Sequence, residues 1–400
     1  TELIEGEEAK AAERLSQLEP FYRWTLDGLV EDPSLHEWTL RRIHSHLVHL
    51  RTFLKDLVTE HEKRVILAQG EILSSILFEA HLKDQGEEVA LLPALDTVHL
   101  DANGEASPER IREAWEEKAP AYEGVRVTLT QGFIGRDQHG LIADLGRGGS
   151  DHTATLFGAA LDAEEVQIWT DIDGIHNNDP REVSGTFPVP ELSYEEAAEL
   201  AYFGAKVLHP TAVAPAKEKE IPIRLLNSFD PEARGTLIER RTEAPSGKVR
   251  AIAAKDGITG IRIRSGRMLM AYGFLKEVFA IFEKYRTPID MISTSEVAVS
   301  LTIDDPTYLD RIVEELERLG AVDVAEEQSI VCVVGDLGSG NTATAARIFE
   351  AVGEIPLRMI SYGGSMNNIS FLVDSERKRN VLRSLQEGVF SKGQKERSSV

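Results

Sequence analysis

The sequence has 400 residues, which is more than one ordinary hydrophobic core accommodates, so two or three domains are expected. Its composition is that of a soluble globular protein, with 42% hydrophobic and 28% charged residues. The formal net charge of −23 repels nucleic-acid phosphates and anionic lipid, so the sequence argues against both as partners. Solubility or a salt-adapted source explains the acidic excess equally well.

The single cysteine, Cys332, lies in the apolar run SIVCVVG and is predicted to be a buried strand residue. One cysteine excludes a disulfide framework and a cysteine-based metal site. No apolar stretch approaches the roughly 18 residues that a membrane span needs, and the N-terminus is acidic rather than signal-like. We therefore expect a cytoplasmic protein.

Residues 1 to about 63 are predicted to be helical. In WTLRRIHSHLVHLRTFLKDLV, apolar residues at helical spacing indicate one buried face, formed by Leu40, Ile43, Leu47, Leu50, Phe53, Leu54 and Val58. Three histidines in the same stretch, His44, His46 and His49, do not share one helix face. Surface histidines are therefore the expectation, and no metal site is predicted.

The next segment, AQGEILSSILFEAHLKDQG, predicts a helix that starts near Gly70 and Glu71. A carboxylate at a helix start is favourable without any function. Strands are expected at residues 88–95 and 126–130, and the second ends in Gln131-Gly132-Phe133. Open α/β sheets bind ligands at the carboxyl ends of their strands, so this end is a candidate site.

A glycine-rich turn follows in DLGRGGSDHT, and a helix is expected to open at Ser150-Asp151. Glycines let backbone N–H groups approach an anion, and a helix start adds unpaired donors with partial positive charge. Arg147 supplies a planar fork suited to a carboxylate. The turn therefore predicts an anion site; a glycine turn capped by Ser150, with Arg147 in solvent, is the plain alternative.

After a strand at residues 165–170 comes a polar loop with an Asp-Pro turn that ends at Arg181. Lys206 lies in YFGAKVLHP, an apolar segment predicted to be helical, where a solvated lysine is as good an interpretation as a functional one. Strands in IPIRLLNS and GTLI complete the first domain. TEAPSGK is rich in turn formers and is the predicted linker.

An internal repeat occupies the C-terminal part. IFEKYRTPIDMISTSEVAVSLTID, from Ile281, recurs as IFEAVGEIPLRMISYGGSMNNISFLVD, from Ile348. Two copies of one helix–strand–turn–strand unit predict a pair of small βαββαβ domains. Ferredoxin-like modules that bind no ligand remain the alternative.

The motifs LGRGGSD, IWTDIDGI, NDPR and FGAKVLHP, in this order and spacing, resemble the aspartokinases, and the repeat resembles their two ACT regulatory domains. AQGEILSSILF, TQGFIG and ISTSEVAVSLTID are similar to the single-function, lysine-sensitive members. The resemblance implies an α/β amino-acid-kinase fold (three-layer α/β/α, mostly parallel sheet) followed by two ferredoxin-like ACT domains. The implied domains are an N-terminally truncated catalytic domain at 1–242 and ACT domains at 250–327 and 328–400.

The implied reaction is phosphorylation of L-aspartate to 4-phospho-L-aspartate by ATP, with Mg²⁺ bridging the phosphates, in lysine, threonine and methionine biosynthesis. Feedback through the ACT domains implies an L-lysine effector and a homodimer or homotetramer. A kinase for another carboxylate or carbamate substrate is the alternative within the class. A non-catalytic amino-acid-sensing regulatory subunit is the alternative from another class.

The resemblance also implies roles for particular residues. The catalytic residues would be Arg147, Asp151 and Lys206. The substrate-binding residues would be Glu71, which pairs with the α-amino group, together with Phe133, Arg147, Gly148, Gly149 and Ser150. The nucleotide-binding residues would be Thr170, Asp171, His176, Arg181 and Lys206, with Asp171 and Asp173 contacting ribose or positioning magnesium. The effector-binding residues would be Met268, Gly273, Phe274, Ile289, Asp290, Thr294, Ser295 and Glu296.

Some positions depart from the family pattern. His176 stands where tyrosine is usual, Asn177-Asn178 replaces Thr-Thr, and Ala271 replaces a common serine. The Lys-Phe-Gly-Gly-Thr-Ser loop, whose lysine contacts the transferred phosphoryl group, is missing from a sequence that begins with Thr1. We expect a truncated chain that binds nucleotide weakly and turns over little aspartate. For the effector, Asp290 is the expected partner of the lysine side-chain ammonium, and Glu296 is the second choice.

Overall fold

The structure is a computed structural model that describes residues 8–55, 58–204, 208–240, 247–266, 272–338 and 341–390. The chain divides into two compact units. Unit 1 comprises Thr1–Ile168 and Thr211–Pro222, and unit 2 comprises Trp169–Pro210 and Ile223–Val400. The predicted domain at 1–242 contributes to both units, because its later strands cluster with the repeats. The domain boundaries stay a prediction.

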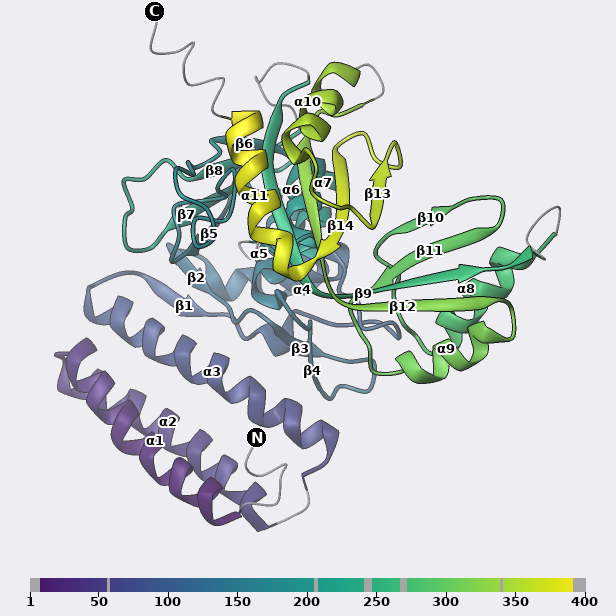
Figure 1. The fold of residues 1–400 in the computed structure, drawn as a ribbon. Coiled ribbons are helices and arrows are strands. Elements are labelled where there is room, and N and C mark those ends of the chain that lie inside the picture. The colour runs from purple at the N-terminus through teal and green to yellow at the C-terminus, as the bar shows by residue number, and fades with distance from the viewer. Residues whose placement is uncertain are drawn as a thin grey trace, which may run out of the picture. The chain divides into compact units, whose positions relative to one another are not determined.

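Unit 1 opens with three helices that pack side by side (Figure 1), namely α1 (Glu8–Leu29), α2 (Pro33–Thr52) and α3 (Glu60–Asp84). Ile43, Leu47 and Leu50 are buried, which confirms the predicted apolar face at these positions. The predicted start of α3 near Gly70 is wrong. Thr59 is the N-cap. Its side chain accepts from the backbone N–H of Glu62, and the Glu62 side chain accepts from the backbone N–H of Thr59. The helix therefore begins at Glu60, ten residues earlier.

The expectation that no apolar stretch approaches the length of a membrane span is wrong, because helix α3 is long and apolar enough, by length and composition alone, to cross a membrane. Its buried residues Leu73, Ile76 and Ala80 belong to the hydrophobic cluster formed with α1 and α2. The apolar composition of α3 therefore reflects its packing as a core helix of unit 1.

The rest of unit 1 surrounds the candidate site with short elements. Strand β1 (Val89–Leu91) pairs in parallel with β2 (Val127–Leu129), and β3 (Ile134–Arg136) pairs antiparallel with β4 (Ile142–Asp144). The helices of this part are α4 (Pro108–Lys118), α5 (Gly149–Ala160) and α7 (Val213–Lys219). One hydrophobic core contains the buried side chains of Val98, Ile111, Ile134 and Leu156. This core fixes the strand ends on either side of residues 130–133.

A four-stranded sheet contains the remaining predicted strands of the first domain. Its order is β5-β7-β8-β6, with β5 (Val166–Thr170), β6 (Glu191–Ser193), β7 (Ile223–Asn227) and β8 (Thr236–Glu239). Strands β6 and β8 run parallel, and β7 is antiparallel to β8. Helix α6 (Tyr194–Tyr202) follows β6 directly, and its N-cap Ser193 forms a capping box with Glu196.

The repeat region, residues 247–390, forms a six-stranded sheet in the order β10-β11-β9-β12-β14-β13. Two long strands, β9 (Val249–Arg264) and β12 (Ala321–Gly335), run through both repeats (Figure 1). The first repeat contains α8 (Phe274–Lys284), β10 (Ile292–Thr294), β11 (Ala298–Ile303) and α9 (Leu309–Glu317). The second contains α10 (Thr342–Val352), β13 (Met359–Tyr362), β14 (Asn368–Asp374) and α11 (Lys378–Leu385). The predicted helix–strand–turn–strand repeat is confirmed.

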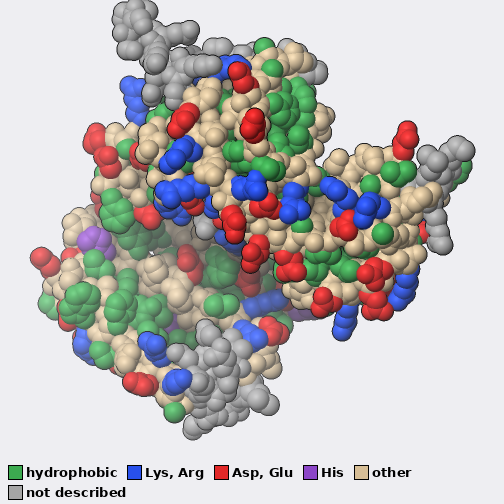
Figure 2. All heavy atoms as spheres, viewed as in Figure 1, with side chains coloured by type: hydrophobic (Ala, Val, Ile, Leu, Met, Phe, Trp, Pro, Cys, Tyr) green, Lys and Arg blue, Asp and Glu red, His purple; other side chains and the backbone are tan. Residues whose placement is uncertain are grey.

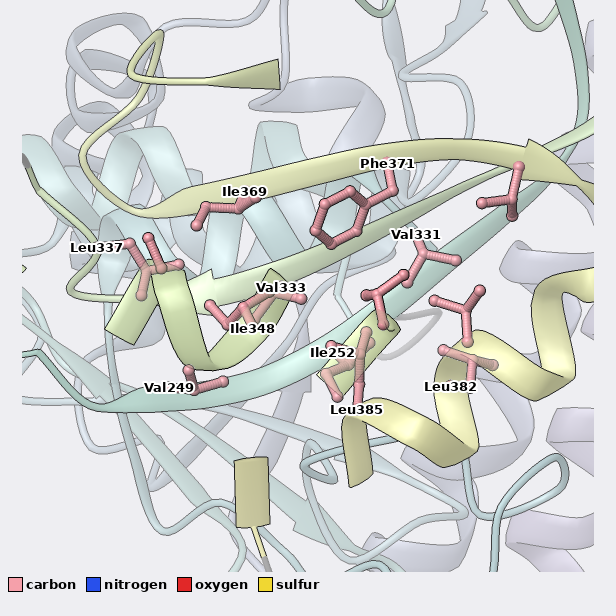
Figure 3. Packing of buried hydrophobic residues seen from close by; sticks show 14 of the residues in the cluster. Val249, Ile252, Val331, Val333, Leu337, Ile348, Ile369, Phe371, Leu382 and Leu385 are labelled. Carbon is pink, nitrogen blue, oxygen red and sulfur yellow. The ribbon is translucent and has the colours of Figure 1, made fainter. Parts of the chain in front are cut away.

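Each repeat has its own core. In the second, side chains of β9, β12 and β14 meet those of α10 and α11 in one cluster (Figure 3), including Val331, Ile348, Phe371 and Leu382. The neighbouring Cys332 is fully buried in β12, as predicted, and burial raises the pKa of its thiol. A protonated, inaccessible thiol is a packing group rather than a nucleophile.

The surface mixes charges of both signs. Acidic and basic side chains lie interspersed over the visible face of the molecule (Figure 2), although the net charge is −23. Exposed ion pairs such as Arg264 with Asp323 also bring opposite charges together on the surface. The excess of acid is thus spread over the chain instead of forming one patch on that face.

Candidate active site

In unit 1, several predicted substrate residues gather around Gly132. Glu71, in the middle of α3, accepts a hydrogen bond through Oε1 from the backbone N–H of Gly132, at 3.1 Å. A Cβ atom built on Gly132 would lie 2.9 Å from Cα, Cβ and Oγ of Ser150. Glu71 and Ser150 are far apart in sequence, yet both lie against Gly132. Because Ser150 approaches so closely, position 132 cannot carry a side chain.

Phe133 adopts a backbone conformation that is unusual for a bulky residue, with φ at 68°. Its N–H donates to Oγ1 of Thr153 at 3.1 Å, and its carbonyl accepts from the N–H of Leu145 at 2.8 Å. Such a conformation costs roughly 1–3 kcal/mol and persists where the surroundings hold it. The Phe133 ring contacts Gly149, where an added Cβ would lie 3.0 Å from it, so the aromatic side chain is fixed against the start of α5.

Two residues that support this arrangement were not predicted. Gln131 is buried; its amide donates to Oγ of Ser75 and accepts from the N–H of Ala94, both at 2.8 Å. The hydroxyl of Thr153 donates to the carbonyl of Gly149 at 2.7 Å, in addition to accepting from Phe133. The position of the polar Gln131, directly before Gly132, could have indicated its role from the sequence. Nothing near Thr153 in the sequence indicated a role for that residue.

The glycine-rich turn has the expected backbone. Gly146 and Gly148 have φ values of 71° and 72°, in the left-handed region that favours glycine. Helix α5 begins at Gly149 with Gly148 as its N-cap, one residue before the predicted start, because the glycine conformation ends the turn there. Arg147 is exposed and has no ion-pair partner among the described residues. Asp151 lies in the first turn of α5.

We expect Gly132→Ala to lower the free energy of unfolding by about 1–3 kcal/mol, because the added methyl group overlaps Ser150. Gly70→Ala is the matched control in the same unit. An added Cβ at Gly70 meets nothing within 4 Å in the middle of α3, so it should raise stability by about 0.4–1 kcal/mol. Urea unfolding measures the change in stability of both variants. Equal behaviour of the two variants would contradict the proposed crowding.

In unit 2, the predicted nucleotide residues follow the carboxyl end of β5. The hydroxyl of Thr170 donates to Oδ1 of Asp171 at 3.1 Å. His176 is held on both ring nitrogens: Nε2 lies 2.7 Å from Oδ1 of Asp173, and Nδ1 lies 3.2 Å from Oγ1 of Thr186. These contacts give the loop after β5 a defined arrangement around His176.

Arg181 is engaged within the same loop. Its guanidinium binds Asp179 through two hydrogen bonds, Nε to Oδ1 at 3.0 Å and Nη2 to Oδ2 at 2.7 Å. This bidentate pair lowers the pKa of Asp179. A bound phosphate would contact the exposed Arg181 side chain while that side chain stays hydrogen-bonded to Asp179. The other predicted phosphate contact, Lys206, lies outside the described residues, and α6 ends at Tyr202.

The two asparagines that replace Thr-Thr have structural roles. Asn177 and Asn178 are buried, and their side-chain amides donate to Oε1 of Gln386 and to the carbonyl of Leu382, both at 3.0 Å. Gln386 in turn donates to the carbonyl of Gly185 at 3.1 Å. The asparagines therefore anchor the loop to the end of α11.

The predicted effector residues lie in the first repeat, apart from Met268, which is outside the described residues. Gly273, with φ at 92°, is the N-cap of α8, and Phe274 is buried in the repeat core with Ile289 packed against that core. Thr294, Ser295 and Glu296 are exposed at the end of β10 and in the turn to β11.

Asp290 has an enclosed side chain, which is 1% exposed. Its Oδ1 accepts from the hydroxyl of Tyr202 and from Nζ of Lys255, each at 2.8 Å. Its Oδ2 has no hydrogen-bond partner among the described residues. Lys255 also pairs with Asp304 at 2.8 Å, and burial together with Asp290 raises the pKa of Tyr202. A buried carboxylate oxygen without a donor is an open position for a ligand cation.

Comparison with known proteins agrees with this organisation. A model of the amino acid kinase family matches residues 25–227, and an ACT domain model matches residues 331–388. Chloroplastic aspartokinase 1 of Arabidopsis thaliana is 34% identical over 413 residues, covering 96% of this chain and 70% of that protein.

Two solved structures of E. coli aspartokinase III are also similar. The complex with aspartate and ADP (R-state) has a TM-score of 0.82 at 32% identity, covering 96% of this chain and 88% of that chain. The complex with lysine and aspartate (T-state) has a TM-score of 0.76 at 32% identity, covering 96% and 87%. The predicted fold class, an amino-acid-kinase domain followed by an ACT region, is confirmed. The chain therefore belongs to the aspartokinase family of ATP-dependent aspartate kinases.

Proposed function

We propose that the aspartate substrate of the kinase reaction binds in unit 1, around Gly132, where ATP phosphorylates its side-chain carboxylate. The supporting observation is the placement of Glu71 and Ser150 on either side of Gly132, next to the first turn of α5. An amino acid needs an acceptor for its ammonium group and donors for its carboxylates. Glu71 offers the acceptor, while Arg147, Ser150 and the amides at the helix start offer the donors.

In the proposed reaction a side-chain carboxylate oxygen of aspartate attacks the γ-phosphorus of ATP. The new O–P bond forms as the bond from that phosphorus to the β,γ-bridging oxygen breaks, and ADP leaves. Such transfer depends mainly on positioning and on neutralising charge. Arg147 and the amides of Gly148 and Gly149 hold the substrate carboxylate, and Asp151 orients the donors around the reacting oxygens.

For the nucleotide we propose the loop after β5, with Thr170, Asp171, His176 and Arg181, together with Lys206. Asp171 and Asp173 would hold a Mg²⁺ ion, which would offset the charge of the phosphates. The loop has suitable oxygen donors, because Asp171 and Asp173 each use one carboxylate oxygen in the contacts described above and keep a second. Arg181 then supplies a cation to the phosphates alongside its bond to Asp179.

We further propose that L-lysine is the effector and that it binds at the first repeat, in a homodimer or homotetramer formed through the ACT region of a cytoplasmic enzyme. E. coli aspartokinase III has been solved with lysine. Asp290 supports the assignment, since its buried Oδ2 lacks a donor and an ammonium group would supply one.

Calorimetry with lysine, threonine and methionine tests the effector proposal. We expect lysine to bind, and Asp290→Ala to weaken that binding about 10- to 100-fold through loss of a charge-assisted hydrogen bond. Asp310→Ala, an exposed acid on α9 of the same repeat, is the matched control and should bind lysine normally. Asp290→Asn keeps the side-chain shape and separates charge from folding. Binding of threonine but not lysine, or unchanged lysine affinity in Asp290→Ala, would refute the assignment.

A further inference from the structure

The loop after β5 is fastened to the second repeat through one side chain. This side chain belongs to Gln386, which follows the last residue of α11 and begins a π-helical turn, Gln386–Phe390. Three groups of the loop form hydrogen bonds with it, namely the side-chain amides of Asn177 and Asn178 and the carbonyl of Gly185. Turns of this kind are rare and occur frequently at functional sites. Gln386 therefore holds both ends of the loop segment 177–185 at one point of unit 2.

Gln386 itself is rigidly placed. Its side chain is buried, and Leu382 and Leu385, which precede it in α11, lie in the core of the second repeat (Figure 3). The turn after α11 packs closely on α10, since a Cβ built on Gly388 would lie 2.5 Å from that of Ala351. The Gln386 amide is bonded through both its oxygen and its nitrogen, which fixes its orientation. Gln386 is thus a fixed attachment point for the loop.

One series of hydrogen bonds leads from Gln386 to Arg181. Oε1 of Gln386 accepts from Nδ2 of Asn178 at 3.3 Å, and the same amide donates to the carbonyl of Leu382. Oδ1 of Asn178 accepts from the backbone N–H of Asp179 at 2.9 Å. Asp179 in turn binds the guanidinium of Arg181 through both carboxylate oxygens. Because each bond fixes the next group, the position of the Arg181 cation depends on Gln386.

A second series leads from Gln386 to His176. Oε1 of Gln386 also accepts from Nδ2 of Asn177 at 3.0 Å. Asn177 accepts through Oδ1 from the backbone N–H of Phe187 at 2.8 Å, and its own N–H donates to the Phe187 carbonyl at 3.0 Å. The preceding residue, Thr186, has its hydroxyl 3.2 Å from Nδ1 of His176. Gln386 therefore also fixes the part of the loop that orients the imidazole.

We propose that Gln386 is a positioning residue for the nucleotide site, which keeps the loop after β5 in the arrangement that binds ADP and ATP. This inference rests on the proposed nucleotide site. With His176 and Arg181 already in place, binding does not have to order a loop of polar side chains. If the loop instead adopts several arrangements, the apparent Kd rises by the inverse of the fraction that is competent to bind.

Gln386→Met tests this role, with Gln328→Met as the matched control. Methionine keeps a long unbranched side chain and removes the hydrogen-bonding amide. We expect Gln386→Met to weaken ADP binding about tenfold, titrated calorimetrically with Mg²⁺ present, because the loss of each hydrogen bond shifts the loop equilibrium about three- to tenfold. Aspartate affinity should stay unchanged. Gln328 is a buried glutamine of β12 whose amide donates to the carbonyl of Glu326, and among the described contacts it does not hold the loop. Gln328→Met should therefore change neither affinity.

Asn178→Ala removes the same link from the side of the loop, outside the core of the second repeat. It should weaken ADP binding to a similar extent, since it also breaks the connection to Asp179. This variant decides the question if Gln386→Met does not fold. Normal ADP affinity in Asn178→Ala would contradict the route to Arg181.

A double-mutant cycle separates positioning from a purely structural role. Arg181→Ala alone should weaken ADP binding about 10- to 100-fold, through loss of a charge-assisted contact with phosphate. In that background Gln386→Met should cost less than about threefold, because the cation that it positions is gone and only the route to His176 remains. A structural glutamine would lower the Tm without changing ADP affinity, or would weaken binding by the same factor in both backgrounds, and either result would overturn the inference.

The same titrations distinguish failure of this inference from failure of the proposed nucleotide site. If the wild-type chain binds no ADP, or if Arg181→Ala binds ADP normally, the nucleotide site is wrong and the inference fails with it. If Arg181→Ala loses ADP affinity while Gln386→Met and Asn178→Ala keep it, the nucleotide site stands and only the positioning role is refuted.

Discussion

Replacing Arg147 by alanine is expected to weaken aspartate binding by about 10- to 100-fold and to leave ADP affinity unchanged. The guanidinium would form charge-assisted hydrogen bonds with a substrate carboxylate, which contribute about 1.5–3 kcal/mol. Arg147 is exposed and has no ion-pair partner among the described residues, so its removal breaks no described internal ion pair. The free energy of unfolding should therefore change by no more than about 0.5 kcal/mol.

Arg112→Ala is the control for Arg147→Ala. Arg112 is another arginine of unit 1, paired with the exposed Asp162 at 2.6 Å, and its loss should leave both affinities unchanged. Arg147→Lys should recover only part of the aspartate affinity, because lysine cannot bind a carboxylate through two parallel hydrogen bonds. Loss of ADP binding with intact aspartate binding in Arg147→Ala would show that the two sites are assigned the wrong way round.

Local periodicity was enough to predict much of the secondary structure. The helical spacing of Ile43, Leu47 and Leu50 marks a face that is buried in α2, and short apolar runs became β5, β7 and β8. The repeat was readable because its two copies have similar lengths and the same element order. These features depend on residues that are close in sequence, so they can be predicted from the sequence alone.

The start of α3 shows where local signals compete. Gly70 suggested a helix start, since glycine costs about 1 kcal/mol in a helix interior. The capping box of Thr59 and Glu62 lies upstream and decides the actual start. Both signals were in the sequence, but only the structure shows that the apolar face of α3 is long enough to outweigh one glycine.

Contacts between distant residues could not be predicted from the sequence. Asp290 meets Tyr202 and Lys255, which are 88 and 35 positions away, and nothing near any of the three indicates the others. The conformation of Phe133, with its positive φ, depends likewise on Thr153 and Leu145. Family resemblance identified Asp290 as a candidate, yet its burial and its open oxygen emerge only from the fold.

Replacing Arg250 by alanine is expected to lower the free energy of unfolding of unit 2 by about 3–5 kcal/mol. The side chains of Arg250 and Glu196 are 9% and 4% exposed, so the variant leaves a carboxylate buried without its cation. Glu196 keeps its capping bond to the N–H of Ser193, at 2.8 Å, which holds the charge in place at the start of α6. The desolvation cost of that charge then appears as lost stability.

Arg264→Ala separates the effect of burial from that of losing an arginine. Arg264 lies on the same strand, β9, and pairs with Asp323 at 3.0 Å, but the two side chains are 60% and 58% exposed. An exposed pair contributes only about 0–1 kcal/mol, so this variant should unfold nearly as the wild type does. Urea unfolding followed by two independent probes measures both variants and checks that unit 2 unfolds in one step.

Adding Glu196→Gln to Arg250→Ala should restore part of the lost stability, because the buried charge is then removed while an acceptor for Ser193 remains. If Arg250→Ala and Arg264→Ala lose equally little, the Glu196–Arg250 pair does not hold α6 to the repeat region.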